Sequence, residues 1–277
     1  LFGGAERLRL EGNLFYAGRN EVNRVGRDDY EWSDLGGRFT ASFLKPALAG
    51  TRWDLLADGV VSRETTDGYT SRLANLTLGL RYRWSDKISA QIGLEGEIGQ
   101  ASDAISALDY RLLGIPASVQ IDTTDRPLDP SRGFRLSAGV TPYLEALGST
   151  VGMTVARAQA SAYFAFDEEA RYILAGRIGL GSIVGADLAD IPANRRFFAG
   201  GGGSVRVFTY RSLGPQAFGQ PIGGRSLLEA SLEARIKITD TIGIVPFVDA
   251  GTAFESSLPD FSERVRVAAG LGLRYYT

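Results

Sequence analysis

Apolar and polar residues alternate along this chain, in one short segment after another. From Leu228 to Thr239, Leu, Ala and Ile occupy every second position, and Glu, Ser, Arg, Lys and Thr stand between them. A period of two places successive side chains on opposite faces of a β-strand. The pattern recurs and predicts about twelve strands, most of them about 9–13 residues long. The other expected strands are Arg7–Tyr16, Leu35–Phe43, Trp53–Glu64, Asn75–Trp84, Ile88–Ile98, Leu113–Thr123, Phe134–Leu144, Thr154–Phe166, Tyr172–Leu180, Ile242–Phe254 and Val265–Tyr275.

Two all-β architectures alternate in this way: a soluble β-sandwich and a transmembrane β-barrel. The expected strands are longer than most sandwich strands and long enough to cross a bilayer at a tilt. Their polar face carries full charges strand after strand, which suits the wet lumen of a barrel. These charged residues include Arg81, Arg83, Glu95, Glu97, Arg157, Arg177, Glu233 and Arg235.

The connections and the aromatic residues also favour the barrel. Short turns on one rim and longer loops on the other are typical of outer-membrane barrels. The expected short connections are Lys45–Gly50, Ser85–Lys87, Asp167–Glu169 and Asp240–Thr241, and the expected long ones are Ala17–Ser33, Gly99–Asp109, Ser182–Arg225 and Glu255–Glu263. Aromatic residues fall near strand ends on the apolar face, as an interfacial belt requires. They are Trp53, Tyr82, Trp84, Tyr172 and Tyr275.

We therefore expect residues 1–277 to form an antiparallel transmembrane β-barrel in the bacterial outer membrane. In a bilayer every backbone polar group has to be paired within the sheet, so the sheet has to close. Its apolar face then meets outer-membrane lipid and its charged face lines a lumen. The alternative, a soluble lipid-binding barrel, predicts a protein that is monodisperse without detergent.

Composition excludes several classes of function. The chain has no His and no Cys, which removes His-dependent nucleophile systems, His or thiolate metal ligation and disulfides. A net charge of −2 gives no basic footprint for nucleic acid. Gly200–Gly203 is followed by no Gly-Lys-Ser/Thr and no helix, so it is not a phosphate-binding loop. Asp122–Asp129 lacks the spacing of a calcium loop. We expect no enzyme, no metal and no cofactor.

The long connection Ser182–Arg225 is the strongest candidate for function. Its four glycines, Gly200–Gly203, form a hinge that would let the loop fold inward. Alternation places Phe247, Asp249 and Gly251 on the lumen side of one strand and Glu233 on that of the strand before it. Arg206 in the loop can reach these carboxylates as a charge-assisted tether. The alternative is that Arg206 is one more solvated loop charge.

Several motifs resemble the outer-membrane assembly superfamily, which contains the TamA and BamA barrels and the two-partner secretion transporters. The segment Ser204-Val205-Arg206-Val207-Phe208 is similar to the superfamily's lumen-loop tetrad, Val/Ile-Arg-Gly-Phe/Tyr. Phe247–Gly251 matches its Phe-x-Asp-x-Gly strand motif, and Ser231-Leu232-Glu233 matches the acidic position one strand earlier. Asp125–Gly133 resembles its periplasmic turn. The lead-in Phe197–Gly201 is most similar to TamA.

The resemblance implies that Arg206 pairs with Asp249 and Glu233. Val207 departs from the tetrad, because a β-branched residue stands where the family has glycine, and it resists positive φ. The family barrel has sixteen strands and is preceded by POTRA domains. We therefore expect this sequence to be a barrel segment without POTRA domains, lacking two strands at each end. Its ends at Leu1–Gly4 and Arg274–Thr277 are expected to be internal to a longer protein or trimmed.

Two functions follow from these expectations. The first is a TamA-like assembly factor that aids insertion or translocation of β-barrel or autotransporter clients, together with a periplasm-spanning partner protein. Its mechanism is β-augmentation at an exposed sheet edge, with local disturbance of the bilayer. The second is a transport pore, either a secretion channel or a passive channel. The pore requires Leu8–Tyr16 to pair with Val265–Tyr275 and seal the barrel.

Overall fold

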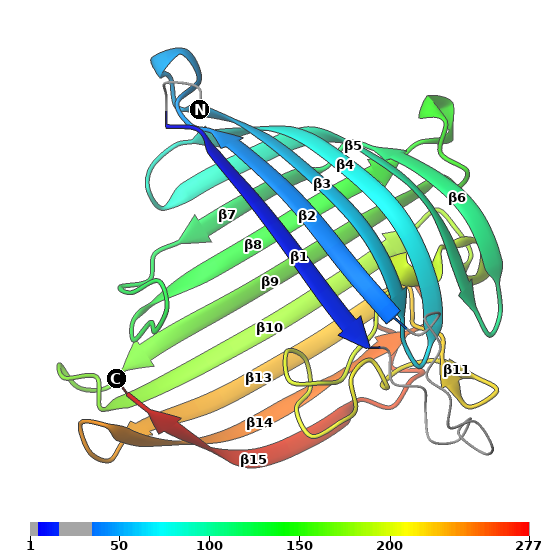
Figure 1. The fold of residues 1–277 in the computed structure, drawn as a ribbon. Helices are drawn as coiled ribbons and strands as arrows, with labels where there is room; N and C mark the ends of the chain where they lie inside the picture. The colour runs from blue at the N-terminus through cyan, green and yellow to red at the C-terminus, as the bar shows by residue number, and fades with distance from the viewer. Residues whose placement is uncertain (1–4, 17–34, 277) are drawn as a thin grey trace.

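The computed structural model describes residues 5–16 and 35–276, and they form an all-β fold (Figure 1). The expected loop Ala17–Ser33 and the end residues 1–4 and 277 lie outside this range. The strands are β1 (Arg7–Tyr16), β2 (Leu35–Lys45), β3 (Trp53–Thr65), β4 (Tyr69–Arg83), β5 (Ile88–Asp103), β6 (Ala107–Gly114), β7 (Ala117–Asp122), β8 (Gly133–Tyr143), β9 (Met153–Ala165), β10 (Tyr172–Val184), β11 (Gln216–Ala217), β12 (Gln220–Pro221), β13 (Ser226–Lys237), β14 (Ile242–Phe254) and β15 (Arg266–Tyr275). In the described part of the chain, no helix is long and apolar enough to cross a membrane.

One antiparallel sheet contains every strand except the small hairpin β11–β12. Its order is β1-β2-β3-β4-β5-β6-β8-β9-β10-β13-β14-β15, and β7 pairs with β5 and β8. Strands β6 and β7 share one position beside β5, so the sheet has the twelve strand positions that alternation predicts. The sheet curves around a hollow interior (Figure 1). The predicted all-β, antiparallel architecture is confirmed.

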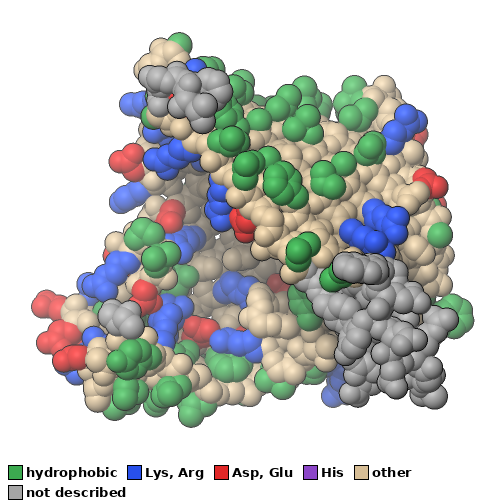
Figure 2. Space-filling model, viewed as in Figure 1, with side chains coloured by type: hydrophobic (Ala, Val, Ile, Leu, Met, Phe, Trp, Pro, Cys, Tyr) green, Lys and Arg blue, Asp and Glu red, His purple; other side chains and the backbone are tan. Residues whose placement is uncertain are grey.

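Closure is the feature on which the two expected functions differ. Strands β1 and β15 are the two edges of the sheet, and within residues 5–16 and 35–276 neither pairs with a second strand. The space-filling view looks through the opening between them into an interior lined with charged side chains (Figure 2). Each edge therefore presents a row of backbone groups that another strand could pair with.

The two faces of the sheet have opposite chemistry. Leu76, Leu78 and Leu94 point outward and are about half exposed, as are many other large apolar side chains. Asp54 and Asp249 point inward and are fully buried. Such an inverted distribution, with apolar residues outside and charged residues inside, is the signature of a wall that faces lipid.

Two expectations about the middle of the chain are wrong. The stretch Gly99–Asp109 is not a long loop, because β5 continues to Asp103 and β6 begins at Ala107. The Asp103 carboxylate accepts hydrogen bonds from the Ile105 and Ser106 backbone N–H groups and closes this tight turn. The expected strand Leu113–Thr123 is broken into β6 and β7 at Ile115–Pro116, since proline has no N–H for the sheet ladder.

The two rims of the sheet differ. One, here called the short-turn rim, carries the turns β2–β3, β4–β5, β9–β10 and β13–β14, together with the longer turn at residues 123–132. The other, the long-loop rim, carries the long β10–β13 and β14–β15 connections but also tight turns at 66–68 and 104–106. The expected belt residues Trp53, Tyr82 and Trp84 lie together at the short-turn rim, with neighbouring ring centroids 4.9 Å apart.

The turn at 123–132 folds back beneath the lumen. Burial raises the pKa of Asp125, but hydrogen bonds from the Ser131 hydroxyl and from the Ser131 and Arg132 N–H groups outweigh it and lower this pKa below its usual value. The turn is thereby held in one conformation. In this conformation Asp129 contacts Arg274 on the edge strand β15 at 2.9 Å.

Candidate functional site: the lumen loop and its anchors

The connection between β10 and β13, residues 185–225, is the candidate functional site and is called the lumen loop here. It starts later than the expected Ser182, because β10 continues to Val184. Short 3-10 turns and the β11–β12 hairpin give it structure of its own. Ile191, Phe197 and Val205 are almost completely buried, so the loop packs inside the barrel instead of extending into solvent.

Arg206 lies at the tip of this loop and contacts the wall through its whole guanidinium. Its Nε and Nη2 donate to the two carboxylate oxygens of Asp249 at 2.6 and 2.7 Å. Its Nη1 donates to Glu233 at 2.7 Å. The Arg206 backbone N–H also donates to Asp249 at 3.0 Å. Two parallel hydrogen bonds from one guanidinium to a fully buried carboxylate are the strongest kind of ion pair that arginine forms.

Phe247 and Gly251 complete the wall beneath the loop tip. The Arg206 guanidinium lies over the Phe247 ring, 3.6 Å from its centroid, in a cation–π contact. At Gly251 a side chain would meet the Val205 side chain at 3.0 Å and the Leu228 carbonyl at 2.8 Å. The strand motif thus supplies a stacking surface, a carboxylate and the space for the loop to approach. Alternation alone places these three residues on one face.

The glycine run forms a tight turn. Gly200 and Gly201 have φ of 105° and 99°, a conformation that side chains rarely adopt. Gly202 and Gly203 have open space around them. Ser204 closes the turn, since its hydroxyl accepts from the Gly200 N–H at 2.8 Å and donates to Glu229. The expected hinge is therefore a turn whose first two positions need glycine.

Val207 adopts a left-handed backbone conformation that favours glycine. Its φ is 77°, in the left-handed region, and its side chain is 79 % exposed. A β-branched residue is strained there, and no packing of the side chain offsets the strain. The loop therefore keeps the glycine-type backbone at this position in spite of the side chain.

We expect Val207→Gly to stabilise the loop. Relief of the left-handed conformation gains about 1–2 kcal/mol, and the extra backbone freedom of glycine in the unfolded state costs about 0.5–1 kcal/mol. The net gain is therefore between zero and about 1.5 kcal/mol, measurable as a higher urea midpoint in detergent. Val207→Ala is the matched control, because it removes the branch and keeps the Cβ. An equal gain in both variants would show that branching, and not left-handed strain, matters at this position.

A second anchor, opposite the first, was not found from the sequence. Arg195 donates to Glu95 at 2.6 Å and to both carboxylate oxygens of Glu97 on β5. Tyr110 and Tyr143 donate to the same carboxylates at 2.9 and 3.0 Å. Glu95 and Glu97 occupy successive inward positions of one strand, and this spacing is the signal that could have pointed to a cationic partner.

Further contacts join the loop to β3, β4 and the end of β5. Arg196 is buried and pairs with Asp103, and it also donates to the backbone carbonyls of Ile191 and Ile222. Arg211 contacts Glu64 at 3.2 Å and the hydroxyl of Tyr69. The loop therefore bridges two walls of the barrel, β13–β14 on one side and β3–β5 on the other. It can position and brace, and among the described residues no acidic cluster could hold a metal ion.

Comparisons with known proteins agree with this geometry. The family model described as "Omp85 superfamily domain" matches residues 1–277. A segment of 109 residues is 28% identical to "Outer membrane protein assembly factor BamA" from Nitratidesulfovibrio vulgaris, and this match covers 38% of the chain and 14% of that protein.

Solved structures share the fold. The structure of BamA from Haemophilus ducreyi lacking POTRA domains 1–3 matches with a TM-score of 0.77 at 18% identity, over 99% of this chain and 64% of that one. CdiB from Escherichia coli matches with a TM-score of 0.63 at 16% identity, over 98% of this chain and 50% of that one. The chain therefore spans less than two thirds of the length of each of these proteins.

Proposed function

Because this chain belongs to the Omp85 superfamily, a non-enzymatic family of integral outer-membrane barrels, we propose that it is the barrel of an assembly factor for outer-membrane proteins. The observation that carries the proposal is the lumen loop, which Arg206 fastens to Asp249 and Glu233 on the inner wall. Within the described strands, the edges β1 and β15 are also unpaired. An unsealed edge costs free energy in a bilayer unless another strand pairs with it. A client strand could satisfy that requirement by β-augmentation while it inserts.

The side chains of the two edges fit such a client. Leu8, Leu10 and Leu14 on β1 point outward and are exposed. Val267 and Leu271 on β15 also point outward and are exposed. A transmembrane strand added to either edge would continue the apolar outer band and the polar inner face without interruption. Clients would therefore be recognised by their alternation and not by one fixed sequence.

Cross-linking during insertion tests this proposal. The chain has no cysteine, so Gly12→Cys on β1 or Ala269→Cys on β15 introduces a single thiol for a client strand that carries another. Ala230→Cys on β13, which is paired on both sides, is the control. We expect mixed disulfides at the edges and none at the control, together with faster folding of the client in liposomes. Equal cross-linking at Ala230→Cys, or no acceleration, would contradict the proposal.

The finer assignment is to the TamA-like group, with autotransporters among the clients and a periplasm-spanning protein as partner. The lead-in Phe197-Phe198-Ala199-Gly200-Gly201 supports it. A self-closed pore is the competing function, and it requires pairing between β1 and β15 that the described strands do not make. Steady single-channel conductance without accelerated client insertion would favour the pore.

A further inference from the structure

The outer wall carries an unusual group of charges at the long-loop rim. Alternation and strand pairing place Arg63 on β3, Arg72 on β4, and Asp109 and Arg111 on β6 on the same face as the lipid-facing Leu76 and Ile98. We call these four residues, together with Gln100, the outer basic patch. Among the described strand residues that face outward, the other charge is Lys45, which pairs with Glu6 at the short-turn rim. Positive charge is thus concentrated at one place on the wall.

The patch is only partly neutralised from within. Arg63 and Arg72 stand directly opposite each other on neighbouring strands, an arrangement that repels. Asp109 accepts a hydrogen bond from Gln100 at 2.7 Å. Arg72 and Arg111 are exposed and form no ion pair with another described residue. Arg63 makes an additional polar interaction besides its place opposite Arg72. Arg72 and Arg111 against the one carboxylate of Asp109 already leave an excess of positive charge. Lys and Arg side chains gather on this part of the wall in Figure 2.

An apolar groove continues from the patch down the wall. A cavity of about 650 Å³ is lined by outward-facing Ala41, Gly59, Ala74 and Gly96, with larger side chains on either side of them. These small residues lie on four successive strands and leave the wall shallow. Arg111 lines this groove and also the cavity of about 1320 Å³ that holds Arg63 and Arg72. Basic and apolar surfaces therefore form one continuous, amphipathic site.

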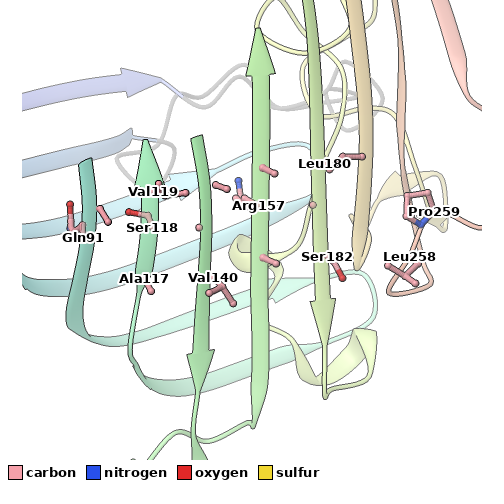
Figure 3. A pocket seen from close by; sticks show the side chains of 16 residues that line it. Gln91, Ala117, Ser118, Val119, Val140, Arg157, Leu180, Ser182, Leu258 and Pro259 are labelled. Atoms are coloured by element: carbon pink, nitrogen blue, oxygen red, sulfur yellow. The ribbon is translucent and has the colours of Figure 1, made fainter. Parts of the chain in front are cut away.

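Another groove on the same wall lacks the basic part. It lies over β5 and β7–β10, has a volume of about 700 Å³ and is lined by Ala117, Val119, Val140 and Leu180, with Leu258 and Pro259 at one side (Figure 3). Its one arginine, Arg157, points into the lumen, where its guanidinium lies 4.5 Å from the Phe197 ring centroid. This groove offers acyl chains a surface but offers a headgroup no cation.

We propose that the outer basic patch binds the phosphorylated headgroup of a lipid of the outer leaflet, whose acyl chains lie in the adjoining apolar groove. Long loops face the cell exterior in outer-membrane barrels, so the patch lies at the level of the outer-leaflet headgroups. Long arginine side chains there extend toward the interface and keep their charge. Phosphate oxygens accept the paired N–H groups of a guanidinium, which explains why arginine and not lysine occupies the patch.

The test is lipid retention by the full chain, purified in detergent and measured by native mass spectrometry with bisphosphorylated lipid A as the probe. Each arginine near a charged membrane surface contributes about fivefold to binding. We therefore expect Arg72→Gln/Arg111→Gln to weaken retention by more than tenfold. The matched control, Lys45→Gln/Arg52→Gln, removes the same charge at the short-turn rim and should retain lipid like the parent. Arg72→Lys/Arg111→Lys keeps the charge and should bind at an intermediate level.

Three results would overturn the proposal. They are equal loss in the control pair, equal retention of lipid A stripped of its phosphates, and displacement of the lipid by inorganic phosphate alone. The last would identify a free-anion site. Both arginines point away from the packed interior, so the variants should keep the parent's heat-dependent shift in gel mobility, which monitors the folded barrel. Lipid retention is measured without a client, so its outcome can be told apart from success or failure of the client-insertion assay.

Discussion

Arg206→Ala is expected to lower the free energy of unfolding by about 3 kcal/mol, near the lower end for breaking a buried ion pair. The loss leaves the fully buried Asp249 carboxylate with only the Ser231 hydroxyl and a backbone N–H as donors. Glu233 loses its contact as well, although it keeps Arg235 at 3.2 Å. Urea unfolding in lipid vesicles measures the effect. Arg264→Ala, an exposed charge in the β14–β15 connection, is the control and should change stability by less than about 0.5 kcal/mol.

A double-mutant cycle separates pairing from general damage. If the guanidinium and the carboxylate act as a unit, Asp249→Ala costs little more once Arg206 is already absent, and a coupling free energy of about 1–3 kcal/mol appears. Additive losses would refute the pairing. Arg206→Lys keeps the charge without the fork and should recover only part of the stability.

Arg195→Met should have an effect of similar size, about 3–5 kcal/mol. It removes the cation shared by Glu95 and Glu97, which then face each other as like charges with side chains 11% and 3% exposed. Two tyrosine hydroxyls and the Asn75 amide remain as donors but carry no charge to compensate the two carboxylates. The same urea titration in vesicles gives the free energy.

Neutralising one carboxylate tests the cause of that loss. Glu97→Gln in the Arg195→Met background should restore part of the stability, whereas in the parent it should destabilise.

The two anchors contact separate carboxylates on different walls, so each single variant should leave the lumen loop held by the other anchor. The combined Arg195→Met/Arg206→Ala variant should loosen it, since only contacts such as Arg196 with Asp103 and Arg211 with Glu64 remain. The loop should then be cut by a protease faster than in either single variant, in a barrel that is still folded. Proteolysis already complete in either single variant would show that the remaining anchor does not suffice to hold the loop.

The sequence predicts the wall better than it predicts what crosses the lumen. Alternation assigns a face to each residue, and the family resemblance adds a partner for Arg206; the structure brings Arg206, Asp249 and Glu233 together. Alternation names no partner for Arg195, because the contact joins segments about a hundred residues apart. Such contacts depend on the curvature of the whole sheet, which no local pattern contains.

The errors in the middle of the chain have a physical origin too. The outward face of β5 and β6 turns polar at Gln100, Asp109 and Arg111, so a rule that expects apolar residues outside interprets the strand ends as loop. The same departure from the rule marks the outer basic patch. Pairing between β1 and β15 stays undecided from the sequence, because it depends on how far apart the two edges of a curved sheet lie.

The lumen loop is attached to β13 and β14 through Arg206 and to β5 through Arg195, so it acts as a tie across the interior of an open ring. The span of the lumen loop sets the distance between β5 and the pair β13–β14. That distance in turn sets the width of the gap between β1 and β15. Loosening either attachment therefore changes the separation of β1 and β15 without any contact to those strands. Spin labels on the two edges would show this as a broader distribution of distances.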